Sequence, residues 1–187
     1  PIAFVNYDTE TGICKPDFIY CYGKALKDDV CREILFPSFN GRIEYMLNGE
    51  IIKVSFDDSV DETGGSNRLR MALSPKGDWM KQVLAEADKE LSRIRKEQED
   101  AAGLVITIDQ KHACDVADLL QSVTGNRPII AISDEPNSSE YIKAFRVGKQ
   151  PWLVAVRMVS EGVDIPRLRV GVYATNVTSE LYFRQAV

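Results

Sequence analysis

Four short apolar runs in the second half of the chain constrain the fold more than any other feature of the sequence. The runs are Leu104–Ile108, Pro128–Ile132, Trp152–Val156 and Leu168–Tyr173. Strands that are apolar on both faces are typical of a parallel sheet covered by helices on both sides. The sequence therefore predicts an α/β fold, and in such folds ligands bind at the carboxyl ends of the strands.

Amphipathic segments fill the gaps between these runs and predict helices. Asp109 is placed to cap the first of them, and Asn137 to cap a second that runs through Val147. A further helix is expected to open at Thr178 or Ser179. The apolar positions that share one face of the first helix are Ala113, Val116, Ala117 and Leu120.

The sequence predicts a boundary near residue 75, between an N-terminal extension of residues 1–75 and an α/β part of residues 76–187. In the extension, Asn48-Gly49 separates two strand-like runs, Arg42–Leu47 and Glu50–Phe56. Asn-Gly favours a tight turn because both central positions of a type I′ turn need positive φ. These residues predict a β-hairpin.

Other segments of the extension and its boundary give weaker signals. Asp57–Asn67 is acidic and contains glycine, which predicts a loop. Ser74-Pro75 favours the start of a helix from about Lys76 to Asp100. The aromatic residues of the extension are expected to pack a small β module, and stacking on nucleic-acid bases is the alternative.

Charge is distributed unevenly along the chain. The 23 basic and 28 acidic residues give a net charge of −5, which argues against a general polyanion binder. Residues 141–170, however, hold six basic and two acidic residues, a local charge of +4. Within them Lys143, Arg146 and Lys149 recur every three residues and share one side of a predicted helix. They are candidates for a nucleic-acid backbone, with an ordinary solvated surface as the alternative.

Cysteine and histidine usage argues against a metal site. The four cysteines form no Cys-x-x-Cys pair, and His112 is the single histidine. Reduced thiols in a cytoplasmic protein are expected, and His112 is expected at a helix start or on the surface, as neither ligand nor base. No apolar run approaches the ~20 residues that cross a bilayer, so no membrane span is expected.

The turn after the third apolar run contains the most informative string, VRMVSEGVDIP at Val156–Pro166. Gly162 lets the backbone approach a ligand closely. Asp164 can accept hydrogen bonds from a ribose hydroxyl, and Ser160 can contact a phosphate. From the chemistry alone, an ordinary turn remains the alternative.

This string and two other sequence blocks occur in the same order as the motifs of a known protein family. VRMVSEGVDIP resembles motif V of superfamily 2 helicases, the DEAD/DEAH-box-like translocases. VITIDQKHACDVADLL, which ends at Leu120, is similar to their motif IV region, and YATNVTSELYFRQAV is similar to the approach to motif VI. The resemblance covers Leu104–Val187, is closest to the DNA-acting, restriction-enzyme-type branch, and implies a RecA-like second motor lobe.

The resemblance also implies residue roles. Gly162 and Asp164 would face the nucleotide ribose and the interface between two lobes. Ser160 and Thr107 would contact the nucleic-acid backbone, and Gln185 matches the motif VI glutamine. The arginines that follow this glutamine in the family lie beyond Val187, so the resemblance stops within motif VI.

Other parts of the family pattern are missing. The sequence contains no Gly-x-x-x-x-Gly-Lys-Ser/Thr loop and no Asp-Glu-x-His string. The chain alone is therefore not expected to hydrolyse ATP. ATP and Mg²⁺ are expected only in a longer protein, together with an N-terminal motor lobe and DNA, with RNA left open. The alternative is a non-catalytic α/β module that binds nucleotides or a protein.

Overall fold

The chain forms two compact units, Pro1–Ser38 and Phe39–Val187. The computed structural model describes residues 8, 10–11, 14, 16–37, 41–47, 50–59, 62–132, 138–156, 165–179 and 182–183. The boundary that the sequence predicted near residue 75 falls inside the second unit, whereas the compact units separate after Ser38.

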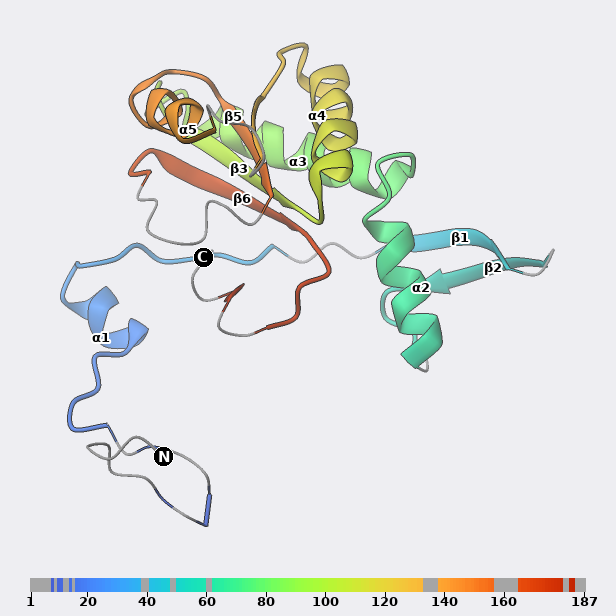
Figure 1. Cartoon of the computed structure of the whole chain (residues 1–187), viewed down its shortest axis with the longest axis horizontal. Coiled ribbons are helices and arrows are strands. Elements are labelled where there is room, and N and C mark those ends of the chain that lie inside the picture. The colour runs from blue at the N-terminus through green and yellow to red at the C-terminus, as the bar shows by residue number, and fades with distance from the viewer. Residues whose placement is uncertain are drawn as a thin grey trace. The chain divides into compact units, whose positions relative to one another are not determined.

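A four-stranded parallel sheet forms the centre of the second unit (Figure 1). Its strands are β3 (Ala102–Thr107), β4 (Ile129–Ala131), β5 (Trp152–Val156) and β6 (Leu168–Ala174), in the order β4-β5-β3-β6. Every residue of the central strands β3 and β5 is buried. The predicted α/β fold with a parallel sheet is therefore confirmed.

Helices cover both faces of this sheet. The helices α3 (Asp78–Ile94) and α4 (Gln110–Thr124) pack with Val105, Val154 and Val172 on one face. On the other face α5 (Ser138–Val147) packs with Leu104 and Leu153. Because neighbouring strand residues point to opposite faces, a strand buried on both sides needs the continuous apolar run that the sequence shows.

The helix boundaries correct two details of the sequence interpretation. Asp109 caps α4 as predicted, since its carboxylate accepts a hydrogen bond from the His112 backbone N–H at 2.8 Å. The preceding helix α3, however, spans Asp78–Ile94 instead of residues 76–100, and its N-cap is Gly77. Ser74 does not cap α3, which has no side-chain cap, and the Ser74 carbonyl instead accepts a hydrogen bond from the Gly77 N–H at 3.0 Å.

The predicted hairpin is confirmed in the strands β1 (Arg42–Leu47) and β2 (Glu50–Ser55). They pair antiparallel, and Leu47 lies opposite Glu50, so two residues connect them. Those two, Asn48 and Gly49, lie outside the described residues.

The segment after the hairpin departs from the prediction, because α2 (Glu62–Ala72) occupies much of the expected loop. Arg68 explains why a glycine-containing segment is helical. Its guanidinium donates to the carbonyls of Ser55 and Asp58 at 2.9 Å and of Phe56 at 3.3 Å. Such tertiary contacts override weak helix propensity. We call β1, β2 and α2, through Leu73, the appended module.

The first unit contains the short helix α1 (Tyr22–Lys27), which has no buried residue. The Tyr22 hydroxyl connects α1 to the segment that follows it, because it donates to the Arg32 carbonyl at 3.1 Å and accepts from the Ile34 N–H at 2.8 Å. Large apolar side chains remain exposed: Phe18, Ile19, Tyr20, Tyr22, Val30, Ile34, Leu35 and Phe36. In the described part of the chain, no helix is both long and apolar enough to cross a bilayer.

Candidate functional site at the carboxyl edge of the sheet

The strand order places a topological switch between β3 and β5. From β3 the chain continues through α4 to β4 at one side of the sheet, whereas from the neighbouring β5 it continues to β6 at the other side. Open α/β sheets bind ligands at such a switch, outside the carboxyl ends of the strands. Here Thr107, Val156 and Ala174 lie in register and form that carboxyl edge.

The string that resembles motif V begins at this edge. Val156 is the last residue of β5, and Ile165, the first described residue after it, is buried in the cluster that includes Phe145. Ser160, Gly162 and Asp164, between them, lie outside the described residues, as does Gln185. The described flanks show that the chain leaves a central strand at the predicted ligand edge.

Thr107 lies at the carboxyl edge, but its side chain is fully buried. Its hydroxyl donates to the Ala155 carbonyl at 3.0 Å, which links β3 to β5. In the described conformation this hydroxyl therefore supports the sheet beneath the site.

The turn after β3 is held by His112. Its Nδ1 accepts the Ile108 N–H at 3.2 Å, so Nε2 carries the proton and donates to the Leu73 carbonyl at 2.7 Å. His112 lies at a helix start, as the sequence indicated, but only 8% of it is exposed. Sequence reasoning missed these bonds because Leu73 is 39 residues away along the chain.

The basic residues do not gather at the carboxyl edge. Lys143 and Arg146 are exposed on α5, which follows β4 and ends before β5, so it runs back toward the amino ends of the strands. Lys149 lies beyond the helix and pairs with Glu99 at 3.2 Å. From Lys143 to Lys149, the three residues thus lie progressively further from the carboxyl edge of the sheet.

Arg167 contributes to the local charge of +4 counted for residues 141–170, but it does not lie on the surface. It is 4% exposed and donates to the carbonyls of Phe145 and Gln150 at 2.8 Å and of Asp100 at 2.7 Å. Burial lowers its pKa from the usual range, and the nearby Arg95 adds to this effect. Arg167 therefore joins three chain segments at the amino edge and presents no charge to a nucleic acid.

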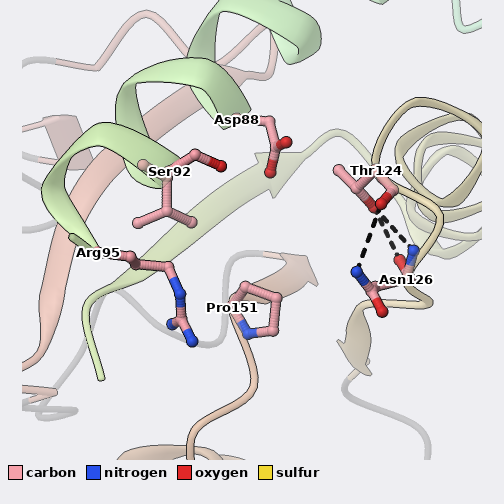
Figure 2. A pocket seen from close by; sticks show the side chains of 7 residues that line it. Asp88, Ser92, Arg95, Thr124, Asn126 and Pro151 are labelled. Carbon is pink, nitrogen blue, oxygen red and sulfur yellow. Dashed lines mark hydrogen bonds between the residues drawn. The ribbon is translucent and has the colours of Figure 1, made fainter. Parts of the chain in front are cut away.

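A pocket of about 360 Å³ lies at the other end of the strands, where Pro151 precedes β5. Figure 2 shows the side chains that line it. The indole N–H of Trp152 donates to Asp88 there at 2.8 Å. Its lining residues are Asp88, Leu91, Ser92, Arg95, Thr124, Asn126 and Pro151. Nowhere among the residues that the structure describes do three potential metal-binding side chains come together.

Comparison with known proteins gives relatives but no activity. No family model matches the chain. A protein of Mycobacterium tuberculosis described as uncharacterized is 40% identical over 191 residues, and one of Mycobacterium leprae, described in the same way, is 38% identical. Both alignments cover the whole chain, which spans 32% of the relatives' length.

Among solved structures, the helicase domain of Hef from Pyrococcus furiosus is similar to this chain. The two are 21% identical, with a TM-score of 0.42, over 54% of this chain and 21% of that chain.

Proposed function

We propose that residues 76–187 form the second motor lobe of an ATP-dependent nucleic-acid helicase or translocase in the cytoplasm. The observation that carries the proposal is the position of the string resembling motif V. It follows the carboxyl end of β5, beside the topological switch of a parallel sheet. The blocks resembling motifs IV and VI accompany β3 and β6 of the same sheet.

The proposed site needs a second lobe, because this chain has no phosphate-binding loop. In the longer protein that lobe would supply the loop and hold Mg²⁺, which neutralises phosphate charge. Asp164 would accept hydrogen bonds from the ribose, and the backbone at Gly162 would approach the nucleotide. Gln185 would complete the nucleotide-facing set.

DNA is the proposed partner, with Ser160 on the side of its backbone and Thr107 supporting the sheet beneath it. The exposed Lys143 and Arg146 supply positive charge along α5, and Lys149 would have to leave Glu99 to contribute. Contacts of this kind release counterions, so binding should weaken as the salt concentration rises.

The test is ATP turnover by the full-length protein with single-stranded and double-stranded DNA and RNA. Asp164→Ala is expected to lower stimulated turnover by about tenfold or more, the effect of losing a hydrogen bond to a charged group. Asp118→Ala is the control, since Asp118 is exposed and pairs with Arg127 at 3.0 Å. Wild-type turnover in Asp164→Ala would remove that residue from the site.

A non-catalytic protein-binding module is the second candidate. The exposed apolar side chains of residues 16–37 favour it, because surfaces of this kind mark protein contacts. A full-length protein that shows no ATP turnover with any nucleic acid would support this alternative over the motor.

A further inference from the structure

We propose that His112 is a positioning residue through which the appended module sets the geometry of the turn after β3. This turn, Ile108–Asp109, lies at the carboxyl edge where we place nucleic-acid binding. The predicted effect on activity therefore rests on the proposed function, whereas the coupling itself rests on hydrogen bonds within this chain.

The first half of the connection is the His112 ring. Its two nitrogens bond to backbone groups on opposite sides, the Ile108 N–H at 3.2 Å and the Leu73 carbonyl at 2.7 Å. The backbone N–H of His112 also donates to Asp109, so the residue contacts both positions of the turn. A planar ring with fixed nitrogen positions holds its two partners at a set separation.

The second half runs from Leu73 into the appended module. Leu73 continues α2, as its N–H donates to the Leu69 carbonyl at 2.9 Å, and its side chain is buried in the core between α3 and α4. Arg68, one turn earlier, holds three carbonyls at the end of β2. A displacement of the hairpin would therefore reach the carbonyl that His112 holds.

A second contact keeps the module in place against α3. The ring centroids of Phe56 and Trp79 lie 4.3 Å apart. The Trp79 ring also fills the space that a Cβ on Gly41 would occupy. Both ends of the hairpin thus contact one tryptophan. This packing attaches both ends of the hairpin to α3, so the module contacts the α/β part at Trp79 as well as at Leu73.

The coupling is tested by amide hydrogen exchange on this chain, without any assumption about activity. His112→Ala leaves the Ile108 N–H without an acceptor, and its exchange should accelerate about tenfold, as for one lost hydrogen bond. Cys114→Ala, an exposed position on the same helix, should leave it unchanged.

Arg68→Met decides between coupling and local packing, because it lies in α2 and leaves α4 intact. We expect Arg68→Met to accelerate amide exchange at Ile108 as well as in β2. The control is Lys53→Met, on the exposed face of the hairpin, which should leave exchange at both places unchanged. Acceleration confined to residues 41–59 would overturn the coupling. This result is interpretable even if His112→Ala fails to fold.

The consequence for activity is tested in the full-length protein. His112→Gln should raise the DNA concentration for half-maximal ATP turnover by about fivefold or more, as for one lost hydrogen bond, with a smaller change in the KM for ATP. Equal changes in both would contradict a positioning role at the nucleic-acid edge. Absence of turnover in the wild-type protein would refute the proposed function alone, since the exchange measurements do not depend on it.

Discussion

The sheet of residues 102–174 and the first unit's residues 16–37 use the same kinds of large apolar side chains in opposite ways. In the sheet region, Phe145 is 0% and Trp152 1% exposed, whereas Phe18 and Phe36 of the first unit are 72% and 68% exposed. Aromatic content alone therefore says little about burial. What differs is the pattern, because only the sheet region alternates buried strands with helices that cover them.

This difference locates the stability of the chain. Burying a large apolar side chain contributes about 1.5–3 kcal/mol, and the described residues of the first unit gain almost none of this. Their large apolar side chains stay exposed to solvent instead. Substitutions of apolar residues should therefore lower the free energy of unfolding strongly in the sheet region and very little in the first unit.

A matched pair of phenylalanine truncations gives the largest expected effect. Phe145→Ala should lower the free energy of unfolding by about 3–5 kcal/mol, since it empties a fully buried site between α5 and the sheet. Phe36→Ala, in the first unit, should change it by less than about 0.5 kcal/mol. Denaturant unfolding followed by circular dichroism measures both, and equal losses would break the comparison.

A smaller loss is expected at the buried Arg167. Arg167→Met leaves three backbone carbonyls without their donor and should cost about 2–3 kcal/mol. The exposed Lys143→Met on α5 is the control and should be nearly neutral. If urea midpoints fall equally for both variants, Arg167 does not join the three segments.

The smallest loss is expected from a glycine pair on neighbouring strands. A Cβ at Gly103 would overlap the Trp152 ring, so Gly103→Ala should cost about 2 kcal/mol through overpacking. Gly171→Ala on β6 meets nothing within 4 Å and should be tolerated. Thermal unfolding distinguishes them, and a stable Gly103→Ala would show that the ring can move aside.

The sheet was predictable because buried strands and capped helices leave local patterns. Asp109 and the alternation of apolar runs with helices indicated β3, α4 and β5. The helix α2 was not predictable, because its glycines argue for a loop and Arg68 stabilises it through the carbonyls of Ser55 and Asp58. The roles of His112 and Arg167 were hidden for the same reason, since their partners are distant in sequence.

The candidate site also has one part that the sequence predicted and one part that it did not. The choice of the carboxyl edge as the candidate site follows from a parallel sheet, which the apolar runs predicted. Thr107 shows the limit, because a hydroxyl at that edge can serve a nucleic acid or, as here, the neighbouring strand. Residue type and position do not distinguish these uses, whereas a hydrogen-bond partner does.

The most direct test of the central claim compares the two edges of the sheet in the full-length protein. Amide hydrogen exchange is measured with and without single-stranded DNA and a non-hydrolysable ATP analogue. Our account predicts new protection at the carboxyl edge, around Ile108–Lys111 and Thr175–Val177, with little change near Asp88 and Asn126. Protection confined to the amino edge, around the pocket of Asp88, would contradict it.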